Sequence, residues 1–196
     1  MNRDDLINTI QQSQEIDIYY DYLLGQEAWV FKDQGDDYVA KYDRFRKFVS
    51  KKLDVPFNNV SIVGSAKTRY SFSPDKDFSE FDDDSDIDLI IVSDSYFGQL
   101  WRAYREISSH SWLKGYSKIT SNIFNEFISL NDDDSDYGQY SLEKWQKKIL
   151  SFKAELQVSF SLPSAINYRI YKNWEAVERY HLDGITKLKI KLNENN

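Results

Sequence analysis

The sequence contains no cysteine, which excludes disulfide bonds and a zinc site built on thiolates. Its two histidines are too few for a histidine-rich metal site. Seven glycines and three prolines argue against a disordered or low-complexity chain. There is no run of about eighteen apolar residues, and the N-terminus lacks the apolar segment of a signal peptide. The sequence therefore predicts a cytoplasmic protein without a membrane span.

Aromatic residues are abundant instead, at 16% of the chain, and 41% of all residues are hydrophobic. A chain of 196 residues with this content can build the core of a single domain, 1–196. The net charge of −7 produces a field that repels polyanions at long range. Extended nucleic acid is therefore disfavoured as a partner, although a local basic patch stays compatible with this charge.

Apolar periodicity predicts the elements and their order. Short runs of Val and Ile, or strict alternation, predict strands at 60–65, 86–92 and 166–171. Helical spacing predicts helices at 4–16, 36–53, 97–108, 119–130, 141–156 and 174–192. This order predicts an α+β fold in which a small mixed sheet carries helices on one side. It divides the domain into a helical N-terminal extension (1–55), a strand–loop–strand core (60–92) and later helices with one strand (97–196).

The residues that can carry chemistry gather in the strand–loop–strand core. Gly64 and Ser65 end the first strand, where a glycine lets the backbone turn close to a ligand, and the amides and hydroxyl can hold phosphate oxygens. Asp86 and Asp88 open the next strand, and residues two apart in a strand project from the same face. Two desolvated carboxylates repel each other unless a cation lies between them. Hence we expect Asp86 and Asp88 to bind a hard divalent ion, Mg²⁺ or alternatively Mn²⁺.

The chain provides its own comparison for these aspartates, because Asp-Asp-Asp-Ser-Asp occurs at both 82–86 and 132–136. The second run precedes Tyr137 and Gly138 and is typical of a solvated loop. The first continues into an apolar strand, where an unpaired charge costs several kcal/mol, so it needs a functional reason. A calcium loop of the EF-hand type is the competing interpretation. Neither run fits it, because glycine is missing at the sixth position of each.

Ile62-Val63-Gly64-Ser65 followed by Asp86-Ile87-Asp88-Leu89 resembles the signature of the polymerase-β-like nucleotidyltransferase superfamily. The resemblance covers about thirty residues and implies a mixed sheet of the nucleotidyltransferase type. It implies an NTP such as ATP as substrate, metal-ion catalysis, and transfer of a nucleoside monophosphate to an acceptor hydroxyl on a protein, an RNA end or a small molecule. The acceptor itself stays unknown. The size of the chain also fits the toxin–antitoxin or defence context in which some members act.

Two further sets of residues follow from this resemblance. Cations in the loop after the glycine corner, Lys67, Arg69 and Lys76, are expected to meet the triphosphate, with an ordinary surface loop as the alternative interpretation. Members that catalyse usually add a third carboxylate from a later strand. The outward positions of the strand at 166–171 are not acidic, so Glu155 is the substitute, with a solvent-facing helical glutamate as the alternative.

Three functions stay open at this level. The first is a Mg²⁺-dependent nucleotidyltransferase, with Asp86 and Asp88 on the metal and Gly64 and Ser65 on the triphosphate. The second is a protein of the same fold that binds nucleotide or a protein partner without catalysis, which the missing third acid favours. The third is an aromatic-rich interaction protein with no small ligand.

Overall fold

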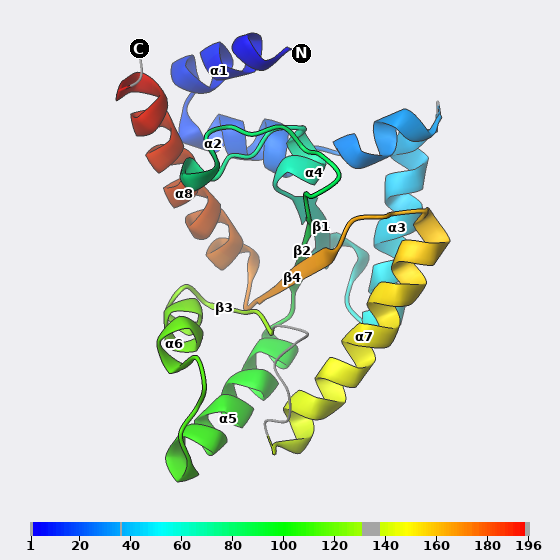
Figure 1. The fold of residues 1–196 in the computed structure, drawn as a ribbon, viewed down its shortest axis with the longest axis vertical. Coiled ribbons are helices and arrows are strands. Elements are labelled where there is room, and N and C mark those ends of the chain that lie inside the picture. The colour runs from blue at the N-terminus through cyan, green and yellow to red at the C-terminus, as the bar shows by residue number, and fades with distance from the viewer. Residues whose placement is uncertain (1, 36, 131–137, 195–196) are drawn as a thin grey trace.

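The computed structural model describes residues 2–35, 37–130 and 138–194 (Figure 1). The acidic run at 132–136, interpreted above as a solvated loop, lies outside these residues. Among the described residues the helices and strands follow one another in an α+β order. They are α1 (Arg3–Gln12), α2 (Glu15–Ile18), α3 (Tyr38–Leu53), β1 (Val60–Val63), α4 (Ser65–Thr68), β2 (Ile87–Val92), α5 (Asp94–His110), α6 (Tyr116–Phe124), β3 (Phe127–Ile128), α7 (Tyr140–Phe160), β4 (Ile166–Tyr171) and α8 (Trp174–Glu194).

Four strands form one mixed sheet in the order β1-β2-β4-β3. Strand β1 pairs antiparallel with β2, and the register places Val63 opposite Asp88. Strand β2 pairs in parallel with β4, which places Asn167 opposite Asp88 and Arg169 opposite Ile90. The sheet therefore brings segments that lie about eighty residues apart in the sequence to adjacent positions around one aspartate. The prediction of a small mixed sheet in an α+β fold is confirmed.

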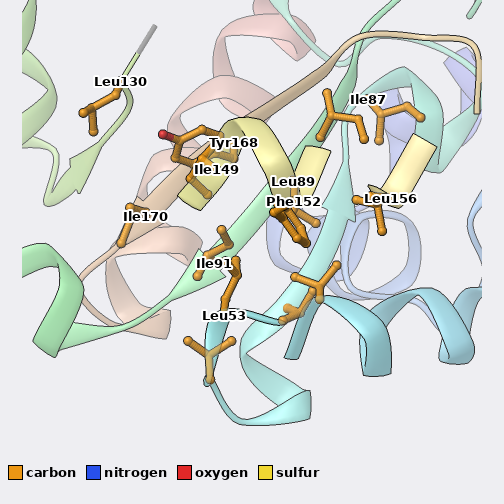
Figure 2. Packing of buried hydrophobic residues seen from close by; sticks show 14 of the residues in the cluster. Leu53, Ile87, Leu89, Ile91, Leu130, Ile149, Phe152, Leu156, Tyr168 and Ile170 are labelled. Carbon is orange, nitrogen blue, oxygen red and sulfur yellow. The ribbon is translucent and has the colours of Figure 1, made fainter. Parts of the chain in front are cut away.

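The larger of the two clusters of buried hydrophobic residues packs on one face of the sheet (Figure 2). Strand β2 contributes Ile87, Leu89 and Ile91 to it, all of which are almost fully buried. The apolar sides of α3 and α7 cover them, because both helices repeat apolar residues every three or four positions. The buried helical residues are Tyr42, Phe45, Val49 and Leu53 of α3 and Leu142, Trp145, Ile149, Phe152, Leu156 and Phe160 of α7.

The opposite face of the sheet is also covered, so the prediction of helices on one side only is wrong. Ile90, Val92 and Tyr171 point to this face and are buried there. Helices α1 and α8 and the segment at 18–23 pack on them, through Leu6, Ile10, Ile18, Tyr19, Leu23, Ala176, Val177, Ile185 and Leu188. The physical reason is that β2 is apolar on both faces, which is typical of a strand enclosed between two layers.

The segment after α6 also differs from its prediction. The apolar spacing predicts a helix through 130, but α6 ends at Phe124, and Glu126 adopts a left-handed backbone with φ +54°. The chain then forms β3, which pairs antiparallel with Tyr171 and Ile170 of β4. A two-residue strand has too little sequence to show period-2 alternation, so its pairing comes from tertiary context. No helix among the described residues is long and apolar enough to cross a membrane.

Adjacent residues of α7 provide a test of this packing. Ile149 is 1% exposed against the sheet, whereas Leu150 is 49% exposed. We expect Ile149→Ala to lower the free energy of unfolding by about 2–5 kcal/mol, since it leaves a cavity in a packed core. Leu150→Ala should change it by less than about 1 kcal/mol. Urea unfolding of the two variants measures both values, and equal losses would contradict the orientation of α7.

Candidate functional site

The glycine bend and the second aspartate of the pair meet at the end of β1. Gly64 has φ +70° and ψ −160°, a backbone conformation that is essentially restricted to glycine. A Cβ atom built at this position would lie 3.0 Å from Oδ2 of Asp88. Any side chain here would therefore collide with the carboxylate or displace it. Glycine is needed both for the turn and for the close approach of Asp88.

Asp86 lies at the same mouth. It directly precedes β2, two residues before Asp88, and Asn167 of β4 donates a hydrogen bond from Nδ2 to Asp86 Oδ2 at 2.9 Å. The amide of Asn167 thus fixes one oxygen of Asp86 and leaves the other oxygen for a further partner. The parallel pairing of β2 with β4 positions this contact.

These residues line one cavity of about 970 Å³ on the face of the sheet that α8 covers. Its wall at the strand ends holds the bend and the two carboxylates. Its other walls carry cations from three separate segments: the loop before β2, strand β4 and helix α8. The charged and polar residues that line it include Gly64, Ser65, Asp75, Lys76, Asp86, Asp88, Asn167, Arg169, Arg179, His181, Asp183 and Lys187.

The charge state of Asp88 is set by two opposed effects. Burial raises the pKa of the Asp88 carboxyl above its ordinary value, and the negative charge of Asp86 acts in the same direction. The positive charges of Arg169 and Lys76 partly oppose this rise in pKa. A cation placed against Asp88 would therefore stabilise its ionised form.

The residues present fit a hard divalent cation. Carboxylate oxygens of Asp86 and Asp88 and the hydroxyl of Ser65 are the oxygen donors that Mg²⁺ prefers, and Asp88 is desolvated. Such an ion usually keeps several waters and takes one or two protein carboxylates, with phosphate oxygens completing its shell. Within the described part of the chain, no group of three or more His, Asp or Glu side chains gathers around a common point.

Lys67 and Arg69, expected at the triphosphate, lie elsewhere. Both line a second cavity, of about 400 Å³, on the other side of α4. The ammonium of Lys67 donates to the carbonyl of Gly25 and lies 4.7 Å from the centre of the Tyr42 ring. Burial lowers the pKa of Lys67 to about 7, and the charge of Arg46 adds to the effect. The structure therefore does not bring Lys67 to the carboxylates.

The position of Arg69 follows from the backbone of its loop. Arg69 has φ +74°, which turns the chain as it leaves α4. Its guanidinium donates from Nε to Oε1 of Glu80 at 2.7 Å, and the bridge between Tyr70 and Glu80 closes the loop. Arg69 thus braces this loop rather than reaching the cavity that holds Asp86 and Asp88.

Glu155, proposed as a third carboxylate, lies on α7 and pairs with Lys52 of α3. Helix α7 packs on the face of the sheet opposite to the one from which Asp88 projects. The structure therefore does not bring Glu155 together with Asp86 and Asp88. The hydrogen bond from Lys52 holds the pKa of Glu155 below its ordinary value, as expected for a surface ion pair.

Sequence reasoning did not identify Asn167, Arg169, Arg179 and His181 as members of this site. The alternation at 166–171 does indicate that Asn167 and Arg169 share one face, but it does not indicate that β4 lies next to β2. Arg179 and His181 belong to α8, whose packing across the sheet is a tertiary feature. The signal that could have identified them is the absence of acidic residues at the outward positions of the strand at 166–171. A strand without carboxylates can supply an amide or a cation as the partner of Asp86 and Asp88.

His181 provides a pH-dependent test of this wall of the cavity. Burial lowers the pKa of His181 to about 3, the charge of Arg169 adds to the shift, and Nε2 is buried without a hydrogen-bond partner among the described residues. The unfolded state binds the proton near pH 6.5, so stability falls as pH drops below this value and continues to fall towards the folded pKa. Between pH 7 and pH 5 this histidine should account for a loss of about 2 kcal/mol. Urea unfolding at both pH values should show that His181→Gln loses less free energy of unfolding than the unsubstituted chain. His110→Gln, the exposed control, should lose as much as the unsubstituted chain. Identical losses for both variants would disprove the assignment.

A tight backbone bend, two adjacent carboxylates and several cations around one large cavity form a set that can hold a polyanion together with a divalent ion. The cations attract the anion, and the metal prevents repulsion between the anion and the carboxylates. Comparison with protein-family models, curated proteins and solved structures gives no match to this chain.

Proposed function

We propose that this cavity binds a nucleoside triphosphate with Mg²⁺ and transfers its nucleoside monophosphate to a hydroxyl acceptor. One observation carries the proposal: the Gly64 bend and the Asp88 carboxylate meet at the mouth of a large cavity, so closely that a Cβ atom added to Gly64 would lie 3.0 Å from Asp88 Oδ2. Phosphate-binding backbone and metal-binding carboxylates have to be adjacent for this chemistry, because an ion held by Asp86 and Asp88 would neutralise charge on the bound phosphates.

Each wall of the cavity has a separate role in this proposal. Asp86 and Asp88 would hold Mg²⁺, or Mn²⁺, which when bound neutralises developing charge on the phosphate oxygens. The hydroxyl of Ser65 and the amides of the bend would bind a phosphate, since glycine lets the backbone come close. Lys76 and Arg169 line the same cavity and add positive charge for the remaining phosphates. Asn167 would position Asp86 through its hydrogen bond.

A second candidate function is binding of Mg²⁺–nucleotide without transfer. The observation that favours it is the identity of the β4 residues on the cavity face. Asn167 and Arg169 occupy this face, so β4 supplies an amide and a guanidinium where a catalytic carboxylate would be expected. Without such a base the acceptor hydroxyl would have to be activated by other means.

Single aspartate substitutions test whether binding depends on the proposed site or on the acidic run that precedes it. We expect the wild-type chain to bind a non-hydrolysable NTP only with Mg²⁺, in isothermal titration calorimetry with each of the four bases. Asp86→Asn and Asp88→Asn should each weaken binding by at least about 10-fold, since each removes a charged partner from a partly desolvated site. Asp84→Asn is the matched control, because Asp84 is exposed and lies two residues before Asp86. It should leave the affinity within about 2-fold.

Turnover is measured separately by release of pyrophosphate and by transfer of an α-phosphate label from each NTP. Release that requires Mg²⁺ and is lost in Asp88→Asn supports the transferase. Binding without release of pyrophosphate or label transfer under any condition supports the second candidate. Absence of Mg²⁺-dependent binding with all four bases, or equal losses in Asp84→Asn and Asp86→Asn, contradicts both.

The bend can be tested through its geometry. Gly64→Ala places a methyl group against Asp88 Oδ2, whereas Gly115→Ala adds one at another positive φ, +76°, with ordinary space around it. Both should lower the free energy of unfolding because alanine is strained at positive φ, by about 1 kcal/mol at Gly115, whose backbone is left-handed helical, and by about 1–3 kcal/mol at Gly64, whose backbone is essentially restricted to glycine. Only Gly64→Ala should also lower the affinity for Mg²⁺–NTP, by at least about 10-fold. Equal affinities of the two variants would show that the bend does not contact the ligand.

A further inference from the structure

Helices α5 and α6 form a hairpin that projects from the body of the molecule, at the end remote from α1 (Figure 1). A groove of about 350 Å³ runs between the two helices. Leu113 in the connecting loop and Ile119 and Ile123 of α6 lie along it, and Trp101 and Tyr104 of α5 face them. This groove shares no lining residue with the cavity of the proposed nucleotide site.

Helix α6 is amphipathic and has no fully buried residue, although Ile119 and Ile123 pack against the core while partly exposed. Phe124 is 88% exposed and Tyr116 is 56% exposed, and Trp112 in the adjoining loop is 81% exposed. A helix of nine residues is marginal on its own in water and normally gains its stability by burying an apolar face. Several large aromatic side chains exposed around one groove mark an interaction surface rather than a scatter of single residues.

The charge of this hairpin differs from that of the rest of the chain. Between Trp101 and Phe124 it carries four basic residues and one acidic residue, although the whole protein has a net charge of −7. The basic residues are Arg102, Arg105, Lys114 and Lys118, and all four are exposed. The guanidinium of Arg105 lies 5.1 Å from the centre of the Trp101 ring at the edge of the groove. Arg105 lines the groove, and the other three lie elsewhere on the hairpin. An apolar groove on a basic hairpin selects a partner of the opposite charge.

We propose that this groove docks a partner protein through an amphipathic helix with acidic flanks. A groove lined by α5 on one side and by α6 on the other fits the apolar ridge of a third helix, whose apolar residues would recur at i, i+3, i+4 and i+7. Acidic side chains beside this stripe would meet Arg105, which lines the groove. Aromatic and arginine side chains such as Trp101, Tyr116 and Arg105 are the types that dominate the energy of such interfaces.

Two other occupants fit less well. A second copy docked by twofold symmetry would place the basic hairpin of one chain against the same hairpin of the other. Single-stranded nucleic acid could stack on the aromatic side chains of the groove, but the net charge of −7 repels a polyanion at long range. Both are outcomes that the test distinguishes.

The test pans the full chain against a displayed library of helical 16-residue peptides with randomised surface positions. The enriched peptides should carry the i, i+3, i+4, i+7 apolar stripe and a net negative charge, and their binding should weaken as salt concentration rises. In calorimetry with the best of them, Phe124→Ala should weaken binding by at least about 10-fold, since it removes an anchor. The variant Arg105→Glu should do so as well, since Arg105 lines the groove. Val158→Ala, which truncates a side chain that is 82% exposed on α7, should leave the affinity within about 2-fold.

Because Phe124 is almost fully exposed, unchanged urea midpoints will show that its variant folds. No enrichment, enrichment of neutral or basic peptides, or equal binding by the Phe124→Ala chain overturns the proposal. So does sedimentation that shows self-association which Phe124→Ala abolishes. Binding of a 15-nucleotide oligo(dT) or oligo(rA) that depends on Phe124 also overturns it, in favour of nucleic acid.

Discussion

The partial burial of a carboxylate at Asp88 is the constraint around which the candidate site is arranged. The residues on either side of it, Ile87 and Leu89, are almost fully buried in the main core, so β2 cannot move to expose Asp88 further. Desolvation then favours the protonated form and raises the pKa of the carboxyl. Three neighbours act on this condition: the bend at Gly64 leaves space for the carboxylate, and Arg169 and Lys76 supply compensating charge.

The alternation of a strand explains how one element supports both a core and a site. Residues at odd positions of β2 point to α3 and α7, where only packing is required. Residues at even positions point to α8, where Ile90 and Val92 are covered and Asp88 is left at the cavity. The site therefore lies on the α8 side of the sheet, and α8 itself lines it with residues between Arg179 and Lys187. The spacing of two positions between Asp86 and Asp88 keeps both carboxylates on this side.

The sequence is sufficient for those features that depend on neighbours along the chain. The Val and Ile runs predict β1 and β2, and the spacing of Asp86 and Asp88 predicts a shared face. It is insufficient for Lys67 and Arg69, because their direction depends on a left-handed turn at Arg69 and on the bridge to Glu80. It is insufficient for β3, which exists only because β4 offers an edge. The second layer of helices could have been expected, since Ile90 and Val92 leave no polar face on β2.

Under the proposed function, a third carboxylate has to come from the face of the sheet that carries Asp88. Glu155 and the rest of α7 lie on the other face, so among the described residues the candidates come from segments that line the cavity, such as β4, α8 and the loop before β2. Strand β4 contributes Arg169, whose guanidinium lies between the rings of Phe127 and Tyr180, at 5.5 Å and 5.2 Å from their centres. These contacts keep a permanent positive charge near Asp88. A fixed guanidinium can neutralise phosphate charge, as a second metal ion does, but it cannot accept a proton from a hydroxyl. Arg169 therefore favours binding of the triphosphate and leaves activation of the acceptor to another group. In the described part of the chain, Asp75 and Asp183 are the carboxylates that line the cavity besides Asp86 and Asp88, so they are the candidates for this role.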